Sequence, residues 1–293
     1  MNIIDIEQLF VKIDDAVAQL NNDELKELLN LQRYKKQEMC MFPSEYITLL
    51  LLHRYGYTKT LKATWDMYKR LNKTDFPNMP SYNVFVTWIN RLVKLLDYIL
   101  HKNIKCLSSE LGIIDSTKLE TTKSYRRGKV HRDATIGYSS VGEFRGFKLH
   151  VLIDEKGAVC QYAITPANVH DITPVKEGFL EGHTGTVLAD SGYIGRALYH
   201  KLMEDNIRFI AKPKANMMEN NSLGLGYLPD WDLHFKKLYK KRMKIERLFD
   251  YFKDKLNMVL NKLHSTKALY VHVVSTILAN QLMKAGEIKF SVI

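Results

Sequence analysis

The sequence lacks long apolar runs. No uninterrupted apolar stretch among its 293 residues approaches the roughly 20 residues that span a bilayer. Residues 46–52 are too short, and polar side chains interrupt residues 270–282. The N-terminus carries Asp5 and Glu7 where a signal peptide would need positive charge before its apolar stretch. We therefore expect a cytoplasmic protein without a membrane partner.

Cysteine is also scarce. The three cysteines, Cys40, Cys106 and Cys160, are far apart and form no C-x-x-C pair, which argues against a disulfide framework and a zinc site. Internal repeats, low-complexity tracts and Pro/Ser-rich linkers are absent from the sequence. A hydrophobic fraction of 46% is enough to bury a sizeable core. We expect a globular protein with one large domain or two ordinary ones.

Acidic residues are fewer than basic ones. The 43 lysines and arginines exceed the 32 aspartates and glutamates, which gives a formal net charge of +11 and a pI near 9.3. Such an excess favours a polyanionic partner. Charge alone does not distinguish nucleic acid from an anionic membrane surface.

Residues 1–105 are predicted to be all-α. Apolar residues recur there at steps of three and four, and strand-like alternation is almost absent. Ser44 could cap one helix, and Ser81 could cap another that presents Asn83 and Arg91 on its polar face. This pair indicates a helix-turn-helix unit whose second helix contacts DNA. The alternative is a plain amphipathic helix with a solvated polar face.

The pattern changes after residue 105, where short apolar runs alternate with turn residues and helical stretches. The predicted strands cover residues 111–114, 146–153, 158–164, 186–189 and 208–211, and the predicted helices cover residues 172–180, 194–204 and 233–256. The order β-β-β-α-β-α-β-α predicts an α/β fold with a mixed five-stranded sheet. We therefore expect an all-α DNA-binding domain at residues 1–105 and an α/β domain with C-terminal helices at residues 106–293.

Two aspartates directly follow predicted strands. Asp115 and Asp190 would lie at the edge of the sheet, where ligands of α/β proteins gather, and could face each other across a cleft. Taken singly, each is explained more simply as a turn residue or a helix cap. Asp133 and Asp154 are the nearest competitors of Asp115.

The last predicted helix carries a polar stripe. Tyr239, Arg242, Glu246 and Lys253 are separated by steps of three, four and seven, so they share one face. The alternative is a basic helix laced by ion pairs, but Glu246 is followed by two more acids at i,i+4 steps, where like charges repel. Residues 234–255 hold nine basic and three acidic residues, a net charge of +6. This face should be attracted to DNA.

These spacings resemble the Y-R-E-K signature of DDE transposases from bacterial insertion sequences, in the order Tyr239, Arg242, Glu246, Lys253. Asp115 and Asp190 look like the first and second acids of that family. The resemblance covers about residues 110–283 and implies a ribonuclease H-like catalytic core. Only 55 residues separate Asp190 from Glu246, so the chain is similar to members without an insertion domain before the last acid.

The resemblance implies a metal-dependent enzyme. It would bind the terminal inverted repeats of an insertion sequence, expose 3′-hydroxyl ends and transfer them to target DNA. The implied cofactors are two ions of Mg²⁺ or Mn²⁺. Asp115 would bridge both ions, Asp190 would hold one of them and Glu246 the other. Arg242, Lys253 and Tyr239 would contact DNA. The resemblance also implies a homodimer on paired DNA ends, associated with a prokaryotic nucleoid.

Residues 118–148 form a second basic segment, with eight basic and three acidic residues. We expect an exposed hairpin or loop that clamps the DNA backbone, with a solvated loop as the alternative. Further predicted DNA contacts, within this segment and beyond it, are Arg126, Arg127, Lys129, Arg132, His170 and Lys212. A lone histidine such as His170 is equally explained as a structural hydrogen bonder.

Two other functions fit parts of this pattern. A ribonuclease H-like, structure-selective nuclease would use the same metal chemistry but would not need the helical N-terminal half. A non-catalytic DNA-binding regulator would need only the helices and basic faces, and the acid triad argues against it.

Overall fold

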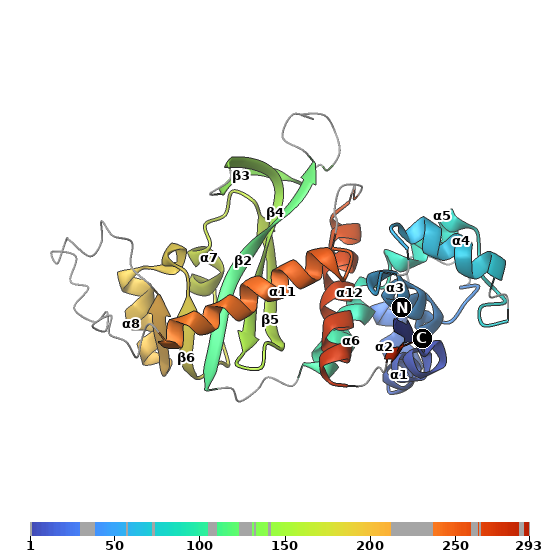
Figure 1. Ribbon diagram of the computed structural model, residues 1–293, viewed down its shortest axis with the longest axis horizontal. Helices are drawn as coiled ribbons and strands as arrows, with labels where there is room; N and C mark the ends of the chain where they lie inside the picture. The colour runs from blue at the N-terminus through green and yellow to red at the C-terminus, as the bar shows by residue number, and fades with distance from the viewer. Residues whose placement is uncertain are drawn as a thin grey trace. The chain divides into compact units, whose positions relative to one another are not determined.

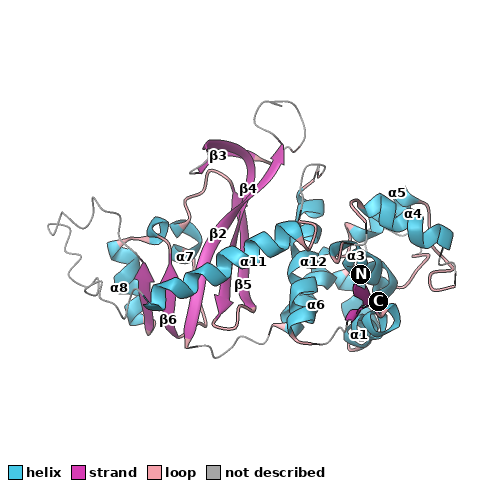
Figure 2. Cartoon of the chain, in the orientation of Figure 1, coloured by secondary structure: helices cyan, strands magenta, loops and turns pink. Residues whose placement is uncertain are grey.

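The computed structural model describes residues 2–29, 39–56, 58–71, 74–104, 110–122, 131, 133–139, 142–211, 237–258, 263, 265–286 and 290–292. The chain forms two compact units. The helical unit comprises Met1–Ile104, Tyr251–Val259 and Leu263–Ile293, and the sheet unit comprises Lys105–Asp250 and Leu260–Lys262. Figure 2 shows that nearly all strands of the described chain belong to the sheet unit.

The helical unit is built around two largely buried helices (Figure 1). Its helices are α1 (Ile6–Ala18), α2 (Asn22–Leu28), α3 (Pro43–Arg54), α4 (Leu61–Leu71), α5 (Tyr82–Ile89), α6 (Val93–Asn103) and α12 (Thr266–Lys284). Every residue of α3 except Glu45 is buried, and α12 packs against α6 and α3. A short antiparallel pair, β1 (Asn2–Ile4) with β8 (Phe290–Val292), joins the two ends of the chain. None of the described helices has the length and apolarity that a membrane span requires.

The C-terminal helix α12 belongs to the helical unit and not, as predicted, to the same domain as the sheet. Sequence patterns put all residues after 105 into one domain, but α12 is apolar on nearly all sides and packs with the N-terminal helices. A helix of this kind must be buried, and the helical unit supplies the partners that bury it. The unit boundary falls within the helix that carries Glu246, between Asp250 and Tyr251.

The start of α3 also differs from the prediction. Ser44 is not the cap, because Phe42 is the N-cap and Pro43 occupies the first helical position, which its fixed φ favours. The carboxylate of Glu45 accepts the Phe42 N–H at 2.6 Å. The Ser44 hydroxyl instead donates to Asp14 of α1 at 2.7 Å, which links the two helices.

The predicted helix-turn-helix pair corresponds to α3 and α5, and α4 intervenes between them. Since α3 is buried on nearly all sides, it is a central helix of the unit and does not act as the first helix of an exposed pair. On α5 and just beyond it, Asn83 is exposed, whereas Arg91 lies over the ring of Trp88 at 4.5 Å. The DNA contacts of Asn83 and Arg91 stay predictions.

The sheet unit has one strand more than predicted (Figure 1). Its elements are β2 (Leu111–Thr122), β3 (Thr135–Ser139), β4 (Gly142–Asp154), β5 (Val159–Pro166), α7 (Ile172–Lys176), β6 (Gly185–Ala189), α8 (Arg196–Glu204), β7 (Ile207–Ala211) and α11 (Met243–Asp254). The strand order is β3-β4-β2-β6-β7, with β5 paired to β4. The pairs β2–β6 and β6–β7 are parallel and the others antiparallel, so the sheet is mixed as predicted.

The additional strand β3 and the far half of β2 come from the basic segment that was expected to be an exposed hairpin or loop. Both pair with β4, which is long enough at 13 residues to hold β3 near its start and β5 near its end. Gly146 of β4 is needed at this crossing, because a Cβ there would overlap the backbone carbonyl of Leu119. The register of β2 against β4 shifts between Glu120 and Thr122, directly beside that glycine.

One face of the sheet is covered by α7 and α8. Apolar residues of both helices pack against the inward-facing residues of β2, β6 and β7 in a single cluster. Its members include Ile114, Leu152, Val175, Leu180, Val187, Ala189, Tyr193, Leu198, Leu202, Ile207, Phe209 and Ala211. This core fixes the parallel strands β2 and β6; Asp115 lies within β2 and Asp190 directly follows β6.

Candidate active site

The parallel pairing of β2 and β6 brings Asp115 and Asp190 together. The paired residues are Leu111 with Thr186, and so on to Ile113 with Leu188. Two positions further along this register, Asp115 lies level with Asp190. Asp115 was predicted to follow the end of its strand, but β2 continues past it to Thr122 along β4. It lies instead where β6 ends, so the open edge of β2 begins at this residue.

Both aspartates also bind the backbone that follows them. Asp115 Oδ1 accepts the Ser116 N–H at 2.8 Å, and Asp190 Oδ1 accepts the Ser191 N–H and caps the short 3₁₀ helix Ser191–Tyr193. Asp190 is thus a helix cap, the simpler of its two explanations, and it faces the same site. Its side chain is 50% exposed, whereas that of Asp115 is only 15% exposed.

Arg242 lies among all three predicted acids. Its Nη2 donates to Asp115 Oδ2 at 2.6 Å and lies 3.8 Å from Glu246 Oε1, and its Nη1 lies 3.9 Å from Asp190 Oδ1. Nη1 also donates to the Tyr239 hydroxyl at 3.1 Å. The structure therefore brings Asp115, Asp190, Glu246, Arg242 and Tyr239 to one place.

The predicted helical stripe is only partly helical. The α-helix α11 begins at Met243, and Lys240–Arg242 before it form a 3₁₀ turn. The three-residue step from Tyr239 to Arg242 suits a 3₁₀ turn, in which residues i and i+3 eclipse each other. Lys253 lies two turns beyond Glu246 on α11, in the part that belongs to the helical unit.

Burial sets the electrostatics of this cluster. It raises the pKa of Asp115, although the charge and hydrogen bond of Arg242 and the Ser116 N–H act in the opposite direction. Burial alone would lower the pKa of Arg242, but Asp115 and Tyr239 outweigh it and raise the value. The guanidinium thus stays charged, while the Asp115 carboxylate would be stabilised by stronger positive charge than it now has.

A second ionic cluster lies beside the triad and was not predicted. Asp171 Oδ1 accepts from the Ser116 hydroxyl at 3.0 Å and from Lys148 Nζ at 3.0 Å. Lys148 also donates to the Val169 carbonyl at 2.9 Å. Asp171 directly follows His170, a predicted DNA contact, and this neighbour is the one sequence signal for Asp171. Lys148 lies in a predicted strand, and strand alternation alone does not single it out.

The other predicted residues fall into two groups. Arg126, Arg127, Lys129, Arg132 and Lys212 lie outside the described residues. His170 is exposed beside Asp171 and contacts none of the triad acids in the described part of the chain. The competitors of Asp115 are placed elsewhere: Asp154 accepts the Ala158 N–H in the β4–β5 turn, and Asp133 precedes β3.

Comparison with known families agrees with this geometry. The family described as "Transposase DDE domain" matches residues 105–266, which is more than half of the chain and contains all three acids. The chain belongs to this family. No curated protein sequence matches this chain.

Five solved chains resemble the DDE protein in structure. One is a piggyBac transposase in a synaptic complex with hairpin DNA, with a TM-score of 0.54 at 11% identity. The match covers 97% of this chain and 77% of that chain. At this identity the similarity establishes a shared fold, and it confirms the predicted transposase fold with helices before the sheet.

The donor set of the DDE site suits a hard divalent cation, since all three acids offer carboxylate oxygens. Within the described ranges, however, no group of three or more His, Cys, Asp or Glu side chains is close enough to hold an ion. The guanidinium of Arg242 occupies the space between the carboxylates. The residues fit a metal if Arg242 moves.

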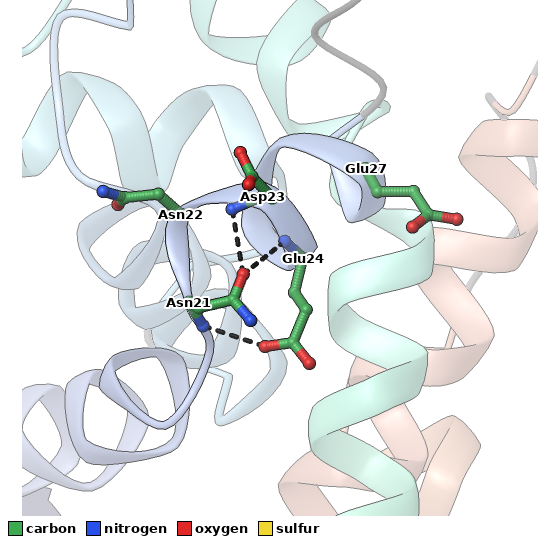
Figure 3. Close-up of a pocket in the computed structure, with 5 residues that line it drawn as sticks. All are labelled: Asn21, Asn22, Asp23, Glu24 and Glu27. Carbon is green, nitrogen blue, oxygen red and sulfur yellow. Dashed lines mark hydrogen bonds between the residues drawn. The ribbon is translucent and has the colours of Figure 1, made fainter.

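A concave surface lies at the start of α2, in the helical unit (Figure 3). It is lined by Asn21, Asn22, Asp23, Glu24 and Glu27. The Asn21 side chain accepts the N–H groups of Asp23 and Glu24, and the Glu24 carboxylate accepts the Asn21 N–H. These polar groups form a capping box that starts the helix, so the hollow is explained without a ligand.

Proposed function

We propose that the chain is a transposase that binds the terminal inverted repeats of an insertion sequence, cleaves DNA to expose 3′-hydroxyl ends and transfers them to target DNA. One observation carries the proposal. Acids from β2, β6 and α11, which are far apart in the sequence, surround a single cationic group in a protein of the DDE transposase family. The solved piggyBac relative is named as a complex with DNA, which supports DNA as the partner here.

In this proposal Asp115, Asp190 and Glu246 are the catalytic acids and hold two ions of Mg²⁺ or Mn²⁺. Such ions supply nucleophile activation and stabilise the charge that develops on the phosphoryl oxygens. Asp115 would contact both ions because it is the most buried of the three and lies within β2, where its pairing with Val151 of β4 fixes its position. Asp190 and Glu246 would each contact one ion.

The protein's own cations would position the DNA. Arg242 can bind a phosphate through its planar guanidinium, and Tyr239 supports it through its hydroxyl and its ring, 5.5 Å from the guanidinium carbon. Lys253 would bind the backbone two turns further along α11. The excess of 43 basic over 32 acidic residues would attract the duplex at long range.

A cleavage and joining assay tests the proposal. Purified protein is incubated with Mg²⁺ or Mn²⁺ and labelled duplexes that carry the ends of the element. The wild type should cut and then join the 3′ ends to a second duplex, and Glu246→Gln should abolish both steps. Asp250→Asn is the matched control, since Asp250 is an exposed acid one turn further along the same helix.

Each other outcome has a defined meaning. Cleavage without joining would favour a structure-selective nuclease, and binding without cleavage would favour a regulator. Activity that survives Glu246→Gln would overturn the site assignment. We also propose that two protomers act on paired ends, and size-exclusion chromatography with paired-end DNA that showed one protomer would contradict this.

A further inference from the structure

Arg242 makes contacts that an ordinary surface arginine does not. An exposed arginine at this position would pair with Glu246, four residues away. The shortest ionic contact of Arg242 is instead to Asp115, 127 residues earlier in the chain. Its side chain is only 13% exposed. In the described part of the chain, its Nε has no hydrogen-bond partner. The side chain is thus directed at the acids even though one of its donors is left unsatisfied.

The position of Arg242 lowers the repulsion among the three acids. Three carboxylates that face one site repel each other, and a positive charge among them relieves the repulsion. The guanidinium does this at 2.6 Å from Asp115, 3.8 Å from Glu246 and 3.9 Å from Asp190. It occupies the place that a cation would otherwise take.

A divalent cation and the guanidinium of Arg242 compete for the negative charge of Asp115. Mg²⁺ binds oxygen at about 2.0–2.1 Å, and the guanidinium nitrogen already lies 2.6 Å from that oxygen. Two positive charges so close together would also repel each other. The ion should therefore bind more tightly once the guanidinium has left Asp115.

A DNA phosphate can remove the guanidinium. Arginine binds phosphate through two parallel hydrogen bonds, and the phosphate competes with Asp115 for the same donors. The Tyr239 hydroxyl would hold the base of the side chain as it turns. A phosphate would also bring its own oxygens to the ions, so its arrival both frees the acids and completes the ligand set.

We propose that Arg242 is an internal counter-ion that keeps metal from Asp115 until a DNA phosphate draws the guanidinium away, so that metal and DNA bind cooperatively. The proposal rests on the proposed function, because it takes the three acids as the metal site. It assigns Arg242 a role in the protein without DNA, in addition to any contact with bound DNA.

Metal binding without DNA tests the first half. Mn²⁺ affinity is measured by the electron paramagnetic resonance signal of the free ion for the wild type, Arg242→Gln and Arg242→Lys. Arg242→Gln should bind Mn²⁺ at least about tenfold more tightly than the wild type, within the range usual for coupling between sites. Arg242→Lys keeps the charge but loses the planar contact, so its affinity should lie between the two and provides a second test should Arg242→Gln fold poorly.

Lys244→Gln is the matched control. It removes the same charge two residues further along the chain, but Lys244 is exposed and donates to the carbonyl of Glu155 rather than to the acids. Its Mn²⁺ affinity should stay close to that of the wild type. Equal tightening in Arg242→Gln and Lys244→Gln would overturn the proposal, since general charge would then explain the effect.

The second half is tested by adding a short DNA duplex, with the Mn²⁺ bound by the duplex alone subtracted. DNA should tighten Mn²⁺ binding by about tenfold in the wild type. It should have little effect in Arg242→Gln, because that variant has no guanidinium for a phosphate to displace. If Asp115→Asn leaves Mn²⁺ binding unchanged, the metal site itself is wrong and the proposed function fails. If Asp115→Asn abolishes binding and Arg242→Gln does not tighten it, only the counter-ion proposal fails.

Discussion

Arg54 of α3 donates from Nη1 to the backbone carbonyl of Asn257, 203 residues later, at 3.1 Å. The same nitrogen lies 3.2 Å from His272 Nε2 of α12. Asn257 in turn donates from its side chain to the Thr58 carbonyl at 2.9 Å. A buried arginine therefore ties the segment after α11 to both central helices of the helical unit.

Replacing Arg54 should destabilise this unit. Arg54→Ala removes the donor of the Asn257 carbonyl and of His272, and it opens a cavity, so the loss should be about 3 kcal/mol. Arg54→Met fills more of that space and should lose less. Urea unfolding followed by the fluorescence of Trp88, which is fully buried in this unit, measures both.

The control is Lys26→Ala, which breaks an exposed i,i+3 ion pair with Asp23 on α2. It should change the free energy of unfolding by less than about 0.5 kcal/mol. Our account of Arg54 is wrong if Arg54→Ala is no more destabilising than this control.

The stability of the helical unit should also fall in mild acid. Burial, with the charge of Arg54 beside it, lowers the pKa of His53 to about 3 and lowers that of His272 well below its usual value. Above pH 6.5 both histidines are neutral whether the chain is folded or unfolded. Below it the unfolded chain takes up protons that the folded unit refuses, so each histidine removes about 1.4 kcal/mol per pH unit until its folded pKa is reached.

Urea midpoints between pH 7 and pH 5 measure this slope. His272→Asn should flatten it by the contribution of one proton. The same slope in the wild type and in His272→Asn would show that the buried histidine does not control it.

Apart from β3, the sequence predicted the order of strands and helices in the sheet unit, because hydrophobic periodicity is local. It also predicted the convergence of Asp115, Asp190 and Glu246, since two of them follow strands and the third lies in a four-residue stripe. The partner of Asp115 could not be predicted. Its pairing with Arg242 requires β2 to continue past the aspartate beside a shorter β6, and that depends on long-range register.

Other differences have similar causes. Strand β3 lies in a polar, basic segment and is a strand only because β4 supplies a partner for it. The helix α12 is apolar enough to pack with either unit, and no local pattern chooses between them. The start of α3, in contrast, was predictable, because Pro43 favours the first helical position.

Gly146 should be essential to the sheet. Its Cα passes so close to Leu119 that any side chain would overlap the backbone of β2. Gly146→Ala should therefore separate β2 from β4 and destabilise the sheet unit by at least about 2 kcal/mol. Hydrogen–deuterium exchange of peptides from the two strands should accelerate.

Gly192 provides the matched comparison. Among the described residues, a Cβ there would meet only Asp171 Oδ2, at an ordinary contact distance of 3.6 Å. Gly192→Ala should leave exchange in β2 and β4 unchanged. Equal effects of the two substitutions would mean that conformational freedom, and not the close approach to Leu119, explains the glycine at position 146.

Asp171 should act as a positioning residue for the acids. It joins Ser116, the neighbour of Asp115, to Lys148 of β4, and its other oxygen faces Gly192, two residues after Asp190. Asp171→Asn keeps the shape but weakens the bonds to Lys148 and Ser116. DNA cleavage should fall by about 10–100-fold, the range found when a group that orients metal ligands is changed, and the fold should be retained.

A double-mutant cycle separates positioning from a general loss of charge. Lys148→Met and Asp171→Asn remove the two ends of one ion pair, so the double variant should be little slower than Asp171→Asn alone. Asp23→Asn, which changes an exposed pair on α2, should leave cleavage and Mn²⁺ affinity unchanged. Because Asp171 acts through the position of Asp115, its loss should also weaken Mn²⁺ binding. Slower cleavage with unaltered Mn²⁺ affinity would instead place Asp171 in contact with the DNA.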